Sequence, residues 1–218
     1  MAERAHPDDP GFSERWCVKW IGGLIPVPVR RRNVYRDALF WRYKVVARHC
    51  RGKDLLDVPC GMGWGTSLLE GCRSMVGIDI ANEAIAEARS RYGHRAEFRV
   101  GDMGTLDIPD SSIDVVSCLE GIEHVPPATG ASFVRECYRV LRAGGLVILS
   151  SPHCNDAPHS GNPYHIKEYR PEEMRALVTP LFEVVEETRR IVDNLTITMF
   201  VLRRRAAVTR GLQLESAS

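Results

Sequence analysis

Residues 55–69 read LLDVPCGMGWGTSLL and carry the pattern that decides the fold of this chain. The apolar run that begins at Leu55 predicts a buried strand, and Asp57 stands near the end of that strand. Glycines follow at positions 61, 63 and 65, where they allow a tight turn and a close approach of the backbone to a ligand. An apolar helix is expected next, and its first turn directs amide donors toward whatever lies there.

A second acidic residue supports the reading of this loop as a binding loop. The segment MVGID predicts another strand that ends in Asp79, 22 residues after Asp57. A carboxylate at the tip of the second strand is suited to hold the two hydroxyls of a ribose. Three glycines alone could be a plain strand-to-helix turn, but the combination of strand, loop, helix and acidic strand end favours a nucleotide-type ligand.

Further along the chain, strand-like and helix-like segments alternate. The expected helices span 33–52, 64–70, 82–92, 131–141 and a short segment from Pro171, and the expected strands span 54–58, 74–79, 96–100, 113–119, 146–150, 181–188 and 195–203. The first five strands are apolar almost throughout, which is typical of a parallel sheet covered on both faces. The pattern therefore predicts an α/β fold: a doubly wound, mostly parallel, seven-stranded Rossmann-like sheet whose last two strands form an antiparallel edge hairpin.

Composition excludes several functional classes. The 218 residues are 44% hydrophobic and 26% charged, with a formal net charge of +1, so we expect a folded protein that does not bind nucleic acid through a basic surface. No apolar run approaches the roughly 20 residues of a membrane span. The charged N-terminus does not resemble a secretory signal, and the seven cysteines are an odd number without a CxxC pair. These features favour reduced thiols and a cytoplasmic location.

The nature of the ligand follows from the loop. A dinucleotide site usually has the spacing GxGxxG, whereas this loop is GxGxG with the carboxylate of Asp57 just before it, which would repel a pyrophosphate. The motifs DVPCGMGWG, VGID, GDM, IDVVSCLEGIEHV and YRVLRAGGLVILSSP, in this order over about residues 50–203, resemble the class I S-adenosylmethionine-dependent methyltransferases. Pro59 stands where that family often has glycine.

The resemblance implies that the cofactor is S-adenosyl-L-methionine and assigns residues to its parts. Its amino acid part would lie against Asp57, Pro59, Gly61 and Gly63, and its ribose hydroxyls against Asp79. Ile80 would pack on the adenine, and Asp102 would accept from the adenine amino group beside Met103. Leu119 and Glu120 would lie near the methyl donor. For Asp102, a plain turn role stays open.

The acceptor side is expected after the fourth and fifth strands, where ligands meet an open α/β sheet. Titratable residues gather there in two segments, CLEGIEHV and SPHCNDAPHSGNPYHIKEY. Removing a proton from a hydroxyl acceptor suits a neutral imidazole, so we expect His124 first and His165 second as the base, with Glu120 as a further catalytic candidate. A capping or packing role for His124 is an equal alternative. The same histidine and carboxylate clusters could also suggest a metal, but no strong metal-ligand spacing occurs, so no metal is expected and a metal site stays an alternative.

EGIEHV followed by NPYHIKEY looks like a subgroup of small methyltransferases among polysaccharide, glycolipid and secondary-metabolite enzymes. That resemblance implies a small-molecule acceptor methylated on a hydroxyl, and a monomer or homodimer. Methylation of an amine or a carboxylate, and a non-catalytic partner subunit, stay open as alternatives.

The chain ends are assigned by exclusion from this core. Residues 1–32 are expected to be an irregular arm or lid, residues 33–205 the methyltransferase domain, and residues 206–218 a flexible tail. The arm could pack on the domain, cover the acceptor with Trp16 and Trp20, or contact a membrane surface beside Arg30–Arg32.

Overall fold

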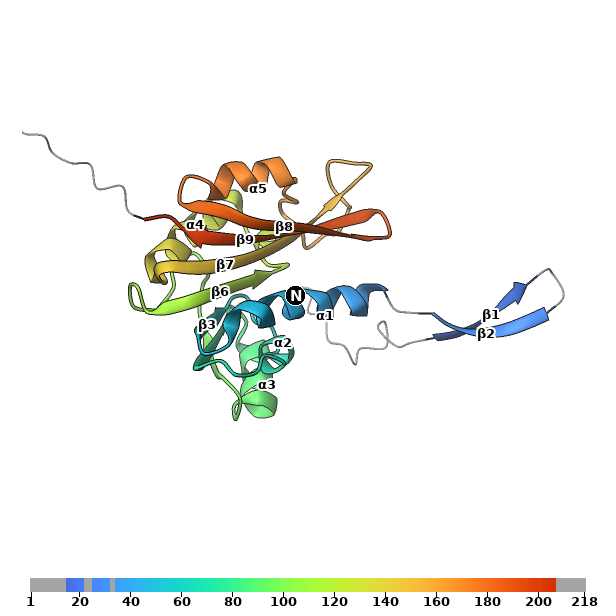
Figure 1. Cartoon of the computed structure of the whole chain (residues 1–218), viewed down its shortest axis with the longest axis horizontal. Coiled ribbons are helices and arrows are strands. Elements are labelled where there is room, and N and C mark those ends of the chain that lie inside the picture. Colours follow the sequence, from blue (N-terminus) through green and yellow to red (C-terminus); the bar gives the residue numbers. More distant parts are fainter. Residues whose placement is uncertain (1–14, 22–24, 32–33, 207–218) are drawn as a thin grey trace, which may run out of the picture.

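The computed structural model describes residues 15–21, 25–31 and 34–206 and contains a seven-stranded sheet (Figure 1). The strand order is β5-β4-β3-β6-β7-β9-β8. The strands are β3 (Asp54–Asp57), β4 (Ser74–Asp79), β5 (Glu97–Val100), β6 (Ile113–Leu119), β7 (Leu141–Cys154), β8 (Phe182–Val192) and β9 (Leu195–Arg204). Strands β3 to β7 pair in parallel, whereas β9 pairs antiparallel with both β7 and β8. The predicted mostly parallel sheet with an antiparallel edge hairpin is confirmed.

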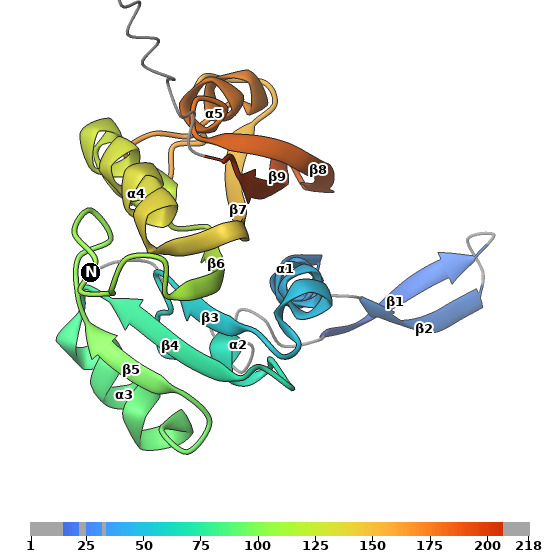
Figure 2. The same ribbon diagram turned by 60° about the vertical axis from the view of Figure 1, so that its left-hand side comes forward.

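Helices cover both faces of the sheet, because successive apolar residues of a strand point to opposite sides. The helices are α1 (Val34–Cys50), α2 (Trp64–Ser67), α3 (Asn82–Tyr92), the 3-10 turn η2 (Ile122–His124), α4 (Pro127–Val140) and α5 (Pro171–Val178). On β3, Leu55 packs in a cluster with Val46 of α1. Its neighbour Leu56 packs in a second cluster with Phe133 of α4 and Met174 of α5. Figure 2 shows α1 and α4 on opposite sides of the sheet.

Several elements differ in length from their predictions: α4 begins at Pro127 rather than at 131, β8 ends at Val192 rather than at 188, and α2 and β7 differ as follows. The helix after the glycine loop ends at Ser67 rather than at residue 70, and Leu68 closes it by donating its N–H to Gly65. Strand β7 has 14 residues instead of five. It begins at Leu141, which pairs with Ile113 of β6, and it continues to Cys154 because Leu146 to Cys154 pair residue by residue with β9. The partners of residues 151–154 stand 41 to 47 positions further along the chain and give no local signal, so this extension could not be read from sequence. It carries the start of the histidine-rich loop to the edge of the sheet.

The N-terminal segment is the clearest correction. Residues 1–32 were expected to be irregular, but β1 (Arg15–Ile21) and β2 (Ile25–Arg31) form an antiparallel hairpin. Pro26 and Pro28 occupy β2, where a two-stranded ribbon tolerates them because each strand has an unpaired edge. Figures 1 and 2 draw this hairpin away from the seven-stranded sheet. The side chains of Trp16 and Trp20 and the tail from residue 207 lie outside the described residues, so the arm, lid and tail assignments stay predictions.

Among the described residues, no helix combines the length and the apolar character that a membrane crossing needs. The six cysteines whose side chains the structure describes are all unpaired thiols, and five of them are buried.

Candidate active site

A cavity of about 380 Å³ opens at the carboxyl ends of the parallel strands. It lies where β3 meets β6, the point at which the strand order reverses and at which open α/β sheets bind ligands. Its walls come from α1, the glycine loop, the ends of β4 and β6, η2, the loop before α5, and the hairpin β8–β9. Of the predicted cofactor residues, those that line it are Pro59, Gly61, Asp79, Ile80, Asp102, Met103, Leu119 and Glu120.

Asp79 fixes the glycine loop to the tip of β4. Its Oδ2 accepts a hydrogen bond from the N–H of Gly61 at 3.0 Å, and its Oδ1 accepts from the N–H of Ala81 at 2.9 Å. Gly61 has a φ of 55°, and a Cβ built on it would meet nothing within 4 Å. Beside it, Ile80 is 68% exposed although it is apolar. The loop, the carboxylate and this apolar side chain thus share one wall of the cavity, as the ribose and adenine assignments require.

Asp57 lies elsewhere than expected. Its carboxylate is fully buried and is not part of the cavity wall. Oδ1 accepts from the hydroxyl of Ser117 at 2.6 Å, and Oδ2 accepts from Thr66 at 2.6 Å and from Tyr43 at 3.2 Å. Burial raises the pKa of Asp57 above its usual range, and these hydrogen bonds oppose that shift. In this structure Asp57 therefore holds β3, β6, α1 and α2 together instead of facing a ligand.

Gly63 also has a packing role. Its φ is 78°, and a Cβ at this position would lie 2.7 Å from Phe98 and 2.8 Å from Ala88. The glycine is needed because α3 and β5 press against the loop here, and Gly63 is not among the cavity-lining residues. Gly63 was predicted to lie against the amino acid part of the cofactor, whereas the contacts that the structure gives it are with Phe98 and Ala88 of the core.

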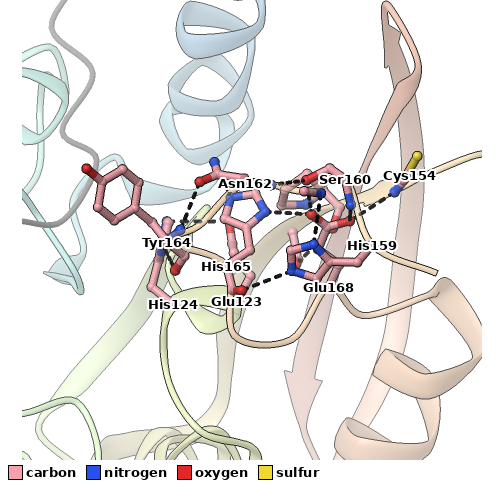
Figure 3. A network of polar contacts seen from close by, with 12 residues as sticks. Glu123, His124, Cys154, His159, Ser160, Asn162, Tyr164, His165 and Glu168 are labelled. Atoms are coloured by element: carbon pink, nitrogen blue, oxygen red, sulfur yellow. Dashed lines mark hydrogen bonds and ion pairs between the residues drawn. The ribbon is translucent and has the colours of Figure 1, made fainter. Parts of the chain in front are cut away.

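Three titratable side chains meet at the acceptor end of the cavity (Figure 3). Glu123 and His124 belong to η2, and His165 comes from the loop before α5. Their ligand atoms all lie within 4.8 Å of one another, and the two imidazole rings make an edge contact with centroids 5.0 Å apart. Glu123 is fully buried. Burial first, and the neighbouring Glu120 second, raise the pKa of Glu123 well above its usual range.

Comparison with known proteins identifies the family. A methyltransferase-domain family model matches residues 56–149, which include the glycine loop, Asp79 and η2. A protein described as a probable S-adenosylmethionine-dependent methyltransferase, from Mycolicibacterium smegmatis, is 36% identical over 153 residues. The chain carries a class I S-adenosylmethionine-dependent methyltransferase domain.

Other relatives agree with this family. A probable S-adenosylmethionine-dependent methyltransferase of Mycobacterium tuberculosis is 37% identical over 144 residues, and a ubiquinone biosynthesis O-methyltransferase of Nitrosospira multiformis is 34% identical over 121 residues. The matched part is 67% of this chain for the Mycolicibacterium smegmatis protein, 62% for the Mycobacterium tuberculosis protein and 52% for the Nitrosospira multiformis protein. The chain spans only 50–58% of the length of these curated relatives.

Solved structures show the same fold at low sequence identity. The [4+2]-cyclase SpnF superposes with a TM-score of 0.68 at 17% identity, over 80% of this chain and 82% of that one. An S-adenosylmethionine-dependent methyltransferase from Methanosarcina mazei superposes with a TM-score of 0.64 at 19% identity, over 74% and 98%. At such identities the likeness concerns the fold alone.

One ion pair in the methyltransferase domain was missed by the sequence analysis. Nη1 of Arg42, on α1, lies 2.8 Å from Oε2 of Glu120, and Ser150 donates a hydrogen bond of 2.8 Å to Oε1. Both oxygens of Glu120 are therefore engaged, which gives this residue a positioning role rather than that of an available base. Arg42 stands four residues after Ala38 and four before Val46, on the buried face of the helix. A charge on an apolar helix face was the signal that could have identified it.

The remaining candidates of the histidine-rich loop lie around His165. Glu168, 3% exposed, accepts from Nδ1 of His165 at 2.7 Å and from the backbone N–H groups of Ser160 and Cys154 at 3.1 and 3.2 Å. Burial raises the pKa of Glu168, but the hydrogen bonds from Ser160 and His165 outweigh it and hold that pKa below its usual range. His159 lies behind His165 and contacts its carbonyl oxygen at 3.0 Å.

His153 and Tyr169, which belong to the same predicted cluster, are both buried and line no part of the cavity.

Proposed function

We propose that the methyltransferase domain binds S-adenosylmethionine in its cavity and transfers the methyl group to a hydroxyl oxygen of a small molecule. The observation that best supports this proposal is that one continuous cavity is lined by Gly61 and Asp79 at one end and by His124 and His165 at the other. Such a cavity has room for a donor and an acceptor side by side, which is what a direct transfer needs.

The donor end fits the cofactor by its chemistry. Asp79, 7% exposed, offers carboxylate oxygens toward the cavity for two ribose hydroxyls, and Ile80 offers an apolar surface for an adenine ring. Asp102 is fixed by a 2.7 Å hydrogen bond that its Oδ1 accepts from the N–H of Gly104, so it can accept from an exocyclic amine. When bound, the cofactor supplies a methyl group on a positively charged sulfur, which needs no further activation.

The acceptor end fits a hydroxyl. An alcohol must lose its proton as the new C–O bond forms, and an imidazole held by a carboxylate is an effective proton acceptor. Glu168 holds His165 in this way, and His124 is held by the carbonyl oxygen of Tyr164, 2.9 Å from its Nδ1. The O-methyltransferase described among the relatives supports oxygen as the methylated atom. We propose a sugar, a glycolipid headgroup or a secondary metabolite as the acceptor class.

A methyl-transfer screen tests this proposal. The purified full chain is incubated with methyl-labelled S-adenosylmethionine and matched acceptors that differ only in carrying a hydroxyl, an amine or a carboxylate. We expect label to accumulate on hydroxyl acceptors. Transfer to the amine or carboxylate alone would replace the hydroxyl assignment with N- or carboxyl-methylation. Cofactor binding without transfer to any member of a broad panel would favour a non-catalytic subunit.

A further inference from the structure

The Glu123–His124–His165 cluster has the composition of a metal site rather than of a proton relay alone. We propose that these three side chains bind one divalent first-row transition-metal ion at the acceptor end of the cavity. Their candidate ligand atoms all lie within 4.8 Å of one another, and all three residues face the cavity. The proposal rests on the proposed function only for the role of the ion, because the binding itself can be measured without any methyl acceptor.

Glu123 gives the first independent reason. Neither of its carboxylate oxygens has a hydrogen-bond donor in good geometry among the described residues, although the side chain is fully buried. Burial raises the pKa of Glu123 and outweighs the hydroxyl of Ser151, which lowers it. Nε2 of His124, 4.0 Å from Oε1, is beyond hydrogen-bond distance. The buried guanidinium of Arg42 is paired with Glu120. A buried carboxylate with such weak hydrogen bonding is costly, and a cation bound to it would remove that cost.

The backbone of Glu123 shows that the position of this carboxylate is imposed by the fold. Its carbonyl oxygen accepts from the N–H of Ile166 at 2.7 Å and from the N–H of Lys167 at 3.1 Å. These bonds tie η2 to the loop before α5, so Glu123 and His165 are brought together by main-chain contacts from two distant segments. A metal site needs this kind of rigid support from elements other than its ligands.

The two histidines give the second reason, because each has one nitrogen already occupied. Nδ1 of His165 donates to Glu168, and Nδ1 of His124 donates to the carbonyl oxygen of Tyr164. Each bond leaves the Nε2 atom as the proton-free nitrogen of its ring. In His165 this nitrogen accepts from the Nδ2 of Asn162 at 3.2 Å, so a metal ion would displace that amide from it. Metal-binding histidines are commonly oriented in this way, by a carboxylate or carbonyl acceptor on the second ring nitrogen (Figure 3).

The ligand set indicates the kind of ion. Two imidazoles and one carboxylate suit Zn²⁺, Fe²⁺, Mn²⁺ or Co²⁺ better than Mg²⁺ or Ca²⁺, which prefer oxygen ligands only. Three protein ligands leave coordination positions open, as in catalytic rather than structural sites.

The open positions suggest a role in the proposed reaction. With their Nε2 atoms on the ion, the two histidines would act as ligands and not as bases, and an acceptor hydroxyl bound to the ion would lose its proton to solvent more easily. Its oxygen would then form the new O–CH₃ bond while the S–CH₃ bond breaks, with that electron pair staying on the sulfur.

Co²⁺ is a suitable probe, since its visible absorption reports nitrogen and oxygen ligands. Chelator-treated full-length protein is titrated with CoCl₂ and followed by absorption and calorimetry. We expect one Co²⁺ per chain, and we expect Glu123→Gln and His165→Ala to weaken binding at least ~100-fold. Glu168→Gln, which weakens the support of His165 and of the loop around it without removing a ligand, should weaken it by about 10- to 100-fold. His94→Gln is the matched control: it also replaces a histidine, but His94 is exposed and lies outside the cavity, so this variant should bind within about threefold of wild type.

S-adenosylhomocysteine binding separates the possible failures. Each variant should bind it as wild type does, which shows that the domain is folded and that its donor end is intact. The metal proposal is overturned if wild-type protein takes up no Co²⁺ at millimolar concentration, or if Glu123→Gln and His165→Ala bind as tightly as His94→Gln. Failure of wild-type protein to bind S-adenosylhomocysteine would instead contradict the proposed function, and the metal-binding result would remain valid without it.

Discussion

Nδ1 of His165 lies 2.7 Å from Oε1 of Glu168, and this pair organises the loop between β7 and α5. The same carboxylate accepts from the backbone of Ser160 and of Cys154, so a segment without regular structure is held by one buried acid. The consequence is that His165 is presented to the cavity in one orientation, opposite His124 on η2. The contact between His165 and Glu168 thus allows two separate segments, η2 and the loop before α5, to form the acceptor end of the cavity together.

The acceptor-end histidines should matter for turnover and little for cofactor binding. Replacing the residue that takes the acceptor proton, or that holds the group that does so, should lower turnover by roughly 10²- to 10⁴-fold. We expect this for His165→Ala and for His124→Ala, with affinity for S-adenosylhomocysteine unchanged. Steady-state kinetics on an acceptor found by the screen, together with calorimetry, checks the prediction. Full activity in both variants would mean that alignment of the substrates is sufficient.

Gly63 should be essential for stability. Gly63→Ala combines a left-handed backbone with a Cβ 2.7 Å from Phe98, so we expect a loss of about 2–4 kcal/mol in the free energy of unfolding. Gly144 is the matched control, because its φ is 74° but a Cβ there meets nothing within 4 Å. Gly144→Ala should therefore lose only the strain, about 1 kcal/mol. Urea denaturation that gives equal losses for the two variants would show that Phe98 moves aside.

The Arg42–Glu120 pair should be energetically coupled. The two side chains are only 9% and 19% exposed, so removing one partner leaves a poorly solvated charge. We expect Arg42→Met to lower the free energy of unfolding by about 3 kcal/mol, and the added substitution Glu120→Gln to restore part of it. A double-mutant cycle in chemical denaturation measures this coupling. Strictly additive losses would mean that the pair contributes nothing beyond its separate packing.

The stability of the protein in acid should depend on Asp54, at the amino-terminal end of strand β3. Hydrogen bonds from Arg73 hold the pKa of Asp54 well below its usual range. A carboxyl whose pKa is depressed by folding contributes stability above its unfolded pKa of about 3.9, and that contribution is lost as the pH falls from there toward the folded value. Asp54→Asn should therefore lower stability at pH 7 and flatten its decline below about pH 4.

Exposed Asp107 provides the control for this comparison, since Asp107→Asn should leave the melting temperature unchanged across the same pH range. If the stability of wild type and of Asp54→Asn falls equally steeply below about pH 4, other carboxyls set the acid sensitivity of the protein.

Much of the fold could be predicted because its signals are local. The apolar runs and the glycine loop predicted the five parallel strands, and helix α3 was predicted at the same bounds, Asn82–Tyr92. The hairpin β1–β2 could not be recognised, because its two prolines argue against strands and only the pairing itself shows that they are tolerated.

The site was predictable by position but not by contact. Asp79 and Ile80 line the cavity as the family resemblance implied, whereas Asp57, from the glycine-loop motif, is turned to Ser117 and Thr66. Spacing along the chain places a residue at a strand end, but the neighbours that occupy its side chain come from other elements. The meeting of Glu123 with His165, 42 positions apart, likewise depends on how the loop before α5 folds back over η2.

The most direct test concerns Asp79 and the donor end of the cavity. Calorimetric titration of the full chain with S-adenosylmethionine should show one binding site. Asp79→Ala removes the acceptor of the ribose hydroxyls and of the Gly61 N–H, so we expect affinity to fall at least ~tenfold while the far-ultraviolet circular dichroism is unchanged. Unchanged affinity in Asp79→Ala, or no binding by wild-type protein, would contradict the assignment of this cavity to the cofactor.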